Sequence, residues 1–221
     1  MIYRIAQFLV RHLWPLIGRL HVHGLDRIPE SGPFILLANH QSYLDPVLIQ
    51  AVVRRPVHTF TKSTQFSTPL GILLKRLNSI PVRRFEIDPQ GVRSALRLLE
   101  AGEAVGIYVE GERSWDDRPQ PPRLGSIRLV LKAGVPVIPA GIRGAYDVWP
   151  RWGRLRRGDV TIRFGSPIRF PRMEDRAARE PHLPEARDRI MTAIAELSGH
   201  DAGASLSPRA EPRGEGPANR R

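Results

Sequence analysis

Apolar residues without a single charge fill the stretch from Phe34 to Ala38, and polar residues end it at Asn39. An uninterrupted apolar run of this length is typical of a strand that is buried on both faces of a sheet. Pro46 follows soon afterwards, and proline suits the first turn of a helix because its missing N–H would have no partner there. The pattern therefore predicts a buried strand over 34–38 and a helix over 46–53.

Similar short apolar segments recur along the chain and alternate with segments of helical periodicity. Further strands are expected over 20–24, 57–61, 80–82, 104–109, 135–142 and 160–164, and further helices over 69–77, 89–101, 126–133 and 183–198. This alternation predicts a single α/β domain over 20–198, with a central mixed, largely parallel sheet flanked by helices. Residues 199–221 are rich in Gly, Pro, Ala and charge, so a disordered tail is expected there.

The first 19 residues form a distinct segment in which apolar side chains alternate with arginines at near-helical spacing. This spacing predicts an amphipathic helix, which Pro15 is expected to kink or shorten. Arg4, Arg11 and Arg19 leave no stretch near the roughly 20 apolar residues that a membrane span needs. Two placements stay open: a helix that lies on a membrane surface, or one that simply packs on its own domain.

The first candidate for chemistry is His40, which follows the predicted buried strand, together with Asp45 at the start of the next helix. A strand end that presents an imidazole and a helix start that returns a carboxylate can hold the two within hydrogen-bond reach. That is the geometry a general base needs. The alternative is that Asp45 is an ordinary N-cap and that His40 is a half-buried loop residue.

Charged residues also follow two other predicted strands: Arg83 and Arg84 after the strand over 80–82, and Glu110 to Arg113 after the strand over 104–109. Ligands of open α/β sheets bind outside the carboxyl ends of the strands. If these ends lie beside that of His40, one cleft holds a base and an anion site, since the guanidinium fork suits phosphate. Each arginine taken alone also fits a solvated surface residue.

Composition narrows the chemistry. The chain has 221 residues and no Cys, which excludes disulfides, thiol nucleophiles and cysteine metal sites. Its net charge of +12 favours anionic partners: membrane lipid, an acidic carrier protein or nucleic acid. The sequence holds no G-x-S-x-G elbow, Walker-type loop or G-x-G-x-x-G turn. A base without a nucleophile of its own suggests that the substrate supplies the hydroxyl.

Four ordered blocks resemble those of the bacterial glycerolipid acyltransferases, and most of all the short 1-acyl-glycerol-3-phosphate acyltransferases of the PlsC type. They are Asn39 to Asp45, which carries an H-x-x-x-x-D spacing, Ile80 to Arg84, Tyr108 to Ser114, and Val135 to Pro139. The resemblance extends over about residues 20–170 and is far more specific than any one block, so it favours the functional interpretation of His40 and Asp45.

The resemblance implies a direct acyl transfer. His40 would deprotonate a glycerol hydroxyl as it attacks the thioester of acyl-CoA or acyl carrier protein, while Asp45 orients the imidazole. Arg84 and Arg113 would bind the acceptor phosphate with Glu110 and Gly111, supported by Asn39, Arg83 and Pro139. The last block would wall the acyl or catalytic region. No metal and no other cofactor is implied. The family's setting implies a peripheral protein on the cytoplasmic face of the inner membrane.

This sequence departs from the family's third block at two positions. The residue before Glu110 is Val109 rather than Pro, and the residue before Arg113 is Glu112 rather than a small hydroxyl residue. A carboxylate beside a phosphate site opposes anion binding unless it points away. Another lysophospholipid or an aminolipid is therefore an alternative acceptor, and a non-enzymatic basic domain that binds membrane or nucleic acid is a further one, although no nucleic-acid recognition motif is present.

A later stretch concentrates tryptophan and arginine: Trp149, Arg151, Trp152, Arg154, Arg156 and Arg157. Tryptophan favours the headgroup level of a bilayer, and arginine is attracted to an anionic surface. The stretch is a candidate contact for a membrane or a carrier protein. The alternative is a solvated basic loop with half-buried tryptophans.

Overall fold

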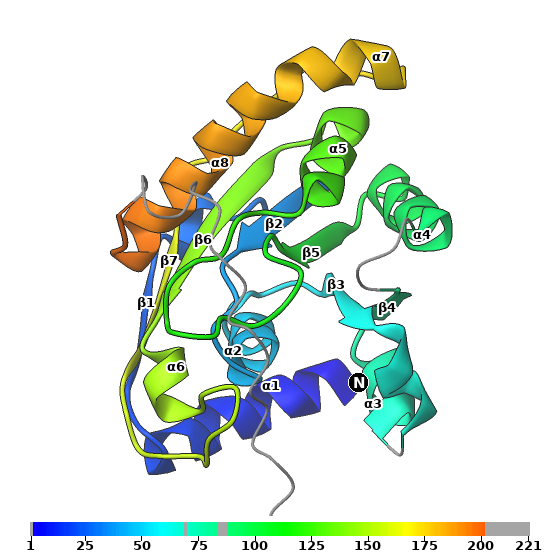
Figure 1. Ribbon diagram of the computed structural model, residues 1–221. Helices are drawn as coiled ribbons and strands as arrows, with labels where there is room; N and C mark the ends of the chain where they lie inside the picture. The colour runs from blue at the N-terminus through cyan, green and yellow to red at the C-terminus, as the bar shows by residue number, and fades with distance from the viewer. Residues whose placement is uncertain (1, 69, 84–87, 202–221) are drawn as a thin grey trace, which may run out of the picture.

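All seven predicted strands are present and form one sheet in the computed structural model, which describes residues 2–68, 70–83 and 88–201 (Figure 1). The strands are β1 (Leu20–His23), β2 (Phe34–Ala38), β3 (Val57–Lys62), β4 (Ser79–Val82), β5 (Ala104–Tyr108), β6 (Val137–Arg143) and β7 (Val160–Phe164). Their order in space is β1-β7-β6-β2-β5-β3-β4. Among these seven strands of the described residues, only β6 and β7 pair antiparallel, so the predicted mixed, largely parallel sheet is confirmed.

Helices cover both faces of this sheet. They are α1 (Ile2–Leu13), α2 (Leu44–Val52), α3 (Leu70–Arg76), α4 (Pro89–Glu100), α5 (Leu124–Ala133), α6 (Ala145–Val148), α7 (Arg176–Arg179) and α8 (Leu183–Ser198). Figure 1 shows α4, α5 and α8 on one face and α1 and α2 on the other. The expected disordered tail falls mostly on residues 202–221, which lie outside the described residues.

Strand β2 lies in the middle of the sheet, and each of its five residues is buried. Because side chains alternate along a strand, Phe34, Leu36 and Ala38 pack into the cluster that includes residues of α2, while Ile35 and Leu37 pack with those of α4, α5 and α8. Two apolar faces explain why this strand needs an uninterrupted apolar run. The same burial fixes the position at which the chain emerges, at Asn39 and His40.

Several boundaries differ from the expected ones. The shortening expected from Pro15 is confirmed, because α1 ends at Leu13 and a 3₁₀ turn over Trp14–Leu16 contains Pro15. Helix α2 begins at Leu44, so Pro46 is its third residue rather than its first. Proline is equally tolerated there, since the N–H groups of the first turn have no partner within the helix. The short helices α6 and α7 have no counterpart in the predicted elements.

Candidate active site

His40 and Asp45 meet as the spacing predicts. The imidazole Nδ1 of His40 lies 2.7 Å from the Oδ2 atom of Asp45, and the two side chains are 8% and 0% exposed. Since a carboxylate only accepts hydrogen bonds, Nδ1 carries the proton and its N–H donates a hydrogen bond to Oδ2 of Asp45. The imidazole is therefore in the tautomer whose Nε2 atom can accept a proton.

Asp45 does more than hold the imidazole. Its Oδ2 atom also accepts the backbone N–H of Gln41 at 2.6 Å and that of Ser42 at 2.8 Å. The alternative in which Asp45 is an N-cap is wrong, because Tyr43 occupies that position and Asp45 is the second helical residue. The carboxylate thus shapes the turn that carries His40 as well as orienting its ring.

Tyr108, the last residue of β5, lies against the ring of His40. The two ring centroids are 4.2 Å apart and the ring planes differ by 23°. Burial raises the pKa of Tyr108 well above its ordinary value, and the charge of Asp45 adds to this effect, so the phenol stays neutral. The sequence gives Tyr108 no role. Its contact follows from the pairing of β5 with β2, which places Tyr108 opposite Ala38.

Glu110 is buried and fastens two backbone segments. Its Oε1 atom accepts the N–H of His40 at 2.9 Å, and its Oε2 atom accepts the N–H of Gln120 at 3.0 Å. Burial raises the pKa of Glu110 well above its ordinary value, while these two N–H groups act in the opposite direction. Both carboxylate oxygens thus accept backbone N–H groups, so Glu110 holds the backbone of His40 in place. Its part in the acceptor-phosphate site stays a prediction.

The segment from Gly111 to Gln120 folds back over the His40 turn. The N–H of Ser114 donates to the carbonyl of His40 at 2.6 Å, and the side-chain amide of Gln41 donates to the Oδ1 atom of Asp117 at 2.6 Å. Gly111 starts this segment with a φ of +74°, in the left-handed region that favours glycine. The arrangement brings Arg113 beside the His40–Asp45 pair.

The guanidinium of Arg113 is half-buried. Its carbon lies 3.5 Å from the centroid of the Tyr43 ring, and its Nη1 atom donates to the carbonyl of Arg151 at 3.4 Å. Burial lowers the pKa of Arg113, and the neighbouring Arg151 charge lowers it further. Within the part of the chain that the structure describes, no carboxylate forms an ion pair with Arg113, so its charge is held beside the His40–Asp45 pair by a ring and a carbonyl.

Arg83 lies away from this site. Strand β4 is at the edge of the sheet, separated from β2 by β5 and β3, which at the usual strand spacing is about 14 Å. Arg83 follows this strand, and its backbone N–H donates to Asp88. The expectation that three strand ends lie side by side is confirmed for β2 and β5 and is wrong for β4. Arg84 lies outside the described residues.

The remaining predicted residues, Asn39 and Pro139, connect β2 with β6. The Nδ2 atom of Asn39 donates to the carbonyl of Ile142 at 2.8 Å, and its Oδ1 atom accepts the N–H of Ile142 at 2.7 Å. The side chain of Asn39 thereby bonds to the backbone of β6 just beyond the point where β2 ends. Pro139 is opposite Leu37 and is buried, so it belongs to the core beneath the site.

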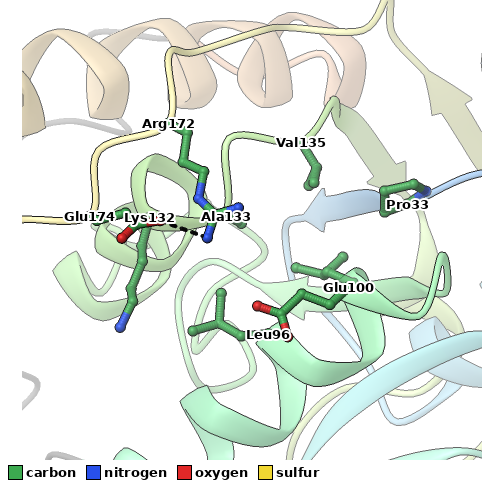
Figure 2. Close-up of a pocket in the computed structure, with 9 residues that line it drawn as sticks. Pro33, Leu96, Glu100, Lys132, Ala133, Val135, Arg172 and Glu174 are labelled. Carbon is green, nitrogen blue, oxygen red and sulfur yellow. Dashed lines mark ion pairs between the residues drawn. The ribbon is translucent and has the colours of Figure 1, made fainter.

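A separate hollow lies at the opposite end of β2 (Figure 2). It is lined by residues that include Pro33, Leu96, Lys132 and the ion pair of Arg172 with Glu174, whose atoms are 2.9 Å apart. Strand β2 lies between Pro33 and His40, and its five residues alone span about 17 Å at the usual rise per residue. This hollow is therefore distinct from the candidate site.

Comparison with known proteins gives a consistent result. Residues 19–143 match the sequence model of the Acyltransferase family. A 1-acyl-sn-glycerol-3-phosphate acyltransferase of Bacillus subtilis is 23% identical over 170 residues, which cover 75% of this chain and 82% of the relative. The chloroplastic relative BAT2 of Brassica napus is 28% identical over 172 residues, or 72% of this chain, which spans about half (49%) of that protein.

The fold also matches a solved structure. The crystal structure of the 1-acyl-sn-glycerophosphate acyltransferase PlsC from Thermotoga maritima superposes with a TM-score of 0.72 at 24% identity, covering 90% of this chain and 80% of the other. At this identity the likeness shows the fold alone, and the family assignment depends on the sequence match. That match covers more than half of the chain, so the protein belongs to the Acyltransferase family of enzymes.

Proposed function

We propose that the protein transfers a fatty acyl group from acyl-CoA or acyl carrier protein to the free hydroxyl of 1-acyl-glycerol-3-phosphate, which yields phosphatidic acid. The observation that carries the proposal is the buried contact of 2.7 Å between His40 and Asp45, with the Arg113 guanidinium beside it. Relatives from Bacillus subtilis and Brassica napus are named for this acceptor.

In the proposed reaction, Nε2 of His40 takes the proton of the acceptor hydroxyl as its oxygen attacks the thioester carbonyl carbon. Asp45 stabilises the resulting imidazolium through Nδ1. The tetrahedral intermediate then collapses, the carbon–sulfur bond breaks, and the leaving thiolate takes the proton from Nε2. Because a thioester is already activated, the transfer needs no cofactor and no covalent enzyme intermediate.

Arg113 is proposed to bind the acceptor phosphate. A half-buried guanidinium interacts with an anion more strongly than a solvated one does, because the local dielectric is lower. Arg84 is proposed as a further phosphate ligand from the family resemblance alone. Arg83, which follows β4 three strands from β2, is not proposed as a ligand. Glu110 and Gly111 would contribute by fixing the segment that carries Arg113, and Asn39 by holding the end of β2.

The test of this assignment is Arg113→Ala, assayed with a panel of lysolipids and one acyl donor. Loss of a hydrogen bond to a charged group is expected to raise the acceptor KM by about 10- to 100-fold, while donor KM is unchanged. Arg97→Ala, at an exposed arginine of α4, serves as the control. A change in donor KM instead would contradict the phosphate assignment, and a preference for another lysophospholipid or an aminolipid would establish the alternative acceptor.

An anionic membrane surface is the proposed site of action, and the packing of α1 supports it. The helix turns polar side chains inward: Gln7 donates to the carbonyls of Gln50 and Val53, and Arg11 donates to that of Ala51. Its outer face carries the exposed apolar residues Ile5, Phe8, Leu9 and Leu13. Among the described residues, no helix has the length and apolar character that crossing a bilayer requires. An outward apolar face on a surface helix fits lipid.

The tryptophan- and arginine-rich stretch divides into two parts. Trp149 packs against the core and Arg151 points inward. Trp152 is 70% exposed, and Arg154, Arg156 and Arg157 are exposed beside it. The outer part is proposed to lie on the same lipid surface as α1, because the Nε atom of Arg157 donates to the carbonyl of Leu16 directly after that helix.

The double substitution Phe8→Ser/Leu13→Ser is expected to lower binding to vesicles that contain phosphatidylglycerol by more than about tenfold, since each large apolar side chain contributes roughly 1.5–3 kcal/mol on burial. Sedimentation with the vesicles measures the bound fraction. Leu25→Ser, at another exposed leucine, is the matched control. Equal binding by the double variant and the control would exclude α1 as the contact.

A further inference from the structure

Glu112 raises a specific electrostatic problem if Arg113 binds a phosphate. Glu112 directly precedes Arg113 in the sequence, at a position where the glycerolipid acyltransferases that the chain resembles have a small hydroxyl residue. A negative charge there repels a phosphate monoester and weakens the attraction of Arg113. The chain must therefore either direct Glu112 away or cancel its charge.

Two arginines surround the Glu112 carboxylate. The Nη1 atom of Arg151 lies 3.0 Å from its Oε2 atom, and the Nη2 atom of Arg123 lies 3.7 Å from its Oε1 atom. The side chains of Arg151 and Glu112 are only 15% and 20% exposed. Salt screens a pair with this little exposure much less than it screens a surface pair, so Arg151 compensates most of the charge.

Arg151 also holds the backbone of the neighbouring residue. Its Nη1 atom donates to the carbonyl of Arg113 at 2.6 Å, and the carbonyl of Arg151 accepts a hydrogen bond from Arg113 at 3.4 Å. The guanidinium of Arg151 lies over the ring of Trp115, with 3.7 Å between its carbon and the ring centroid. The side chain is therefore fixed on three sides: by a carboxylate, a carbonyl and an aromatic ring.

We propose that Arg151 is a positioning residue that adapts this site to a phosphate-bearing acceptor: it cancels the charge of Glu112 and fixes the backbone from which Arg113 extends. The inference rests on the proposed function. Arg151, in the loop after α6, is thereby expected to affect binding of the acceptor. It is not expected to affect binding of the acyl donor or the chemistry of the His40–Asp45 pair.

The test compares Arg151→Gln, Glu112→Gln and the double variant Arg151→Gln/Glu112→Gln. Arg151→Gln leaves a partly uncompensated carboxylate and is expected to raise the KM for lysophosphatidate about tenfold, with kcat and donor KM within about twofold. Glu112→Gln is expected to keep the wild-type acceptor KM or lower it. The double variant should recover most of the loss, because the repelling charge is gone. Arg128→Gln, which breaks the comparable ion pair of Arg128 with Glu180, is the control and should not change any of the three constants.

Recovery in the double variant distinguishes charge compensation from a merely structural contact. A double variant no better than Arg151→Gln, or a Glu112→Gln variant as impaired as Arg151→Gln, would overturn the proposal. So would an equal rise in donor KM. Failure of the wild-type protein to acylate lysophosphatidate would refute the proposed acceptor separately. The same cycle would then be measured with the anionic lysolipid that the protein does acylate, where absence of recovery still refutes the role of Arg151.

Discussion

Replacing His40 by alanine is expected to lower kcat for acyl transfer by roughly 10² to 10⁴, the usual contribution of a positioned general base. In the His40–Asp45 pair, Nδ1 of the imidazole is bonded to the carboxylate, so Nε2 is the atom that takes the proton from the acceptor hydroxyl. Acceptor and donor KM should change little, because the guanidinium of Arg113 is held by other residues. Steady-state rates with lysophosphatidate and one acyl donor measure the effect.

His58 provides the matched control. Its Nε2 atom lies 3.9 Å from a carboxylate oxygen of Glu103, and burial lowers its pKa. It is thus also a partly buried histidine beside an acid, but on β3 and away from the β2 turn. His58→Ala should retain activity. Wild-type turnover by a His40→Ala protein that melts at the normal temperature would remove the proposed mechanism.

Asp45→Asn is the second substitution expected to cost most of the activity, on the order of 10² to 10⁴ in kcat by analogy with other acid-oriented histidines. The Oδ2 atom of Asp45 accepts three N–H groups, from the imidazole of His40 and from the backbone of Gln41 and Ser42. The neutral amide oxygen of asparagine accepts three N–H groups more weakly than a carboxylate oxygen does, and it has no negative charge to stabilise the imidazolium. The loss should therefore appear in kcat and in the pH profile as well as in stability.

Asp88→Asn separates the catalytic loss from the structural one. Asp88 also stands at a helix start, and its carboxylate accepts the backbone N–H groups of Gln90 and Gly91. Because asparagine is about as good a helix cap as aspartate, this variant should lose at most about 0.5 kcal/mol of stability, with kcat unchanged. A comparable kcat for the two variants would show that Asp45 only shapes its turn.

Most helices and strands of the fold can be predicted from the pattern of apolar residues. The uninterrupted run over 34–38 predicts β2 correctly because a strand with helices on both faces needs apolar residues at every position. Pro89 and Gly102 mark the ends of α4 through local chemistry, since proline fits the first helical turn and Gly102 has a φ of +81°. Such features depend only on neighbouring residues, so the sequence is sufficient to predict them.

The order of the strands could not be predicted in the same way. Nothing near Arg83 indicates that β4 lies at the edge of the sheet, because this depends on how helices α3 and α4 pass over the strands. The contacts of Glu110 with His40 and of Arg151 with Glu112 likewise join segments 70 and 39 residues apart. The contact of His40 with Asp45 could be predicted because the two residues are only five positions apart.

The orientation of α1 was also beyond the sequence. Amphipathic spacing shows two faces but not which one meets the protein. The last carbonyls of α2 have no partners within their own helix and carry partial negative charge. Gln7 and Arg11 satisfy them, and this turns the apolar face of α1 outward.

The pairing of β1 with β7 has a consequence for how the chain is made. Leu20 pairs with Val160, so a strand near the beginning must wait for one that leaves the ribosome 140 residues later. At about 5–20 residues per second, that delay is on the order of 10 s. During this interval α1 has already been synthesised, and α2 follows it closely. A nascent chain could therefore reach lipid through its first helix before the sheet that carries His40 is closed.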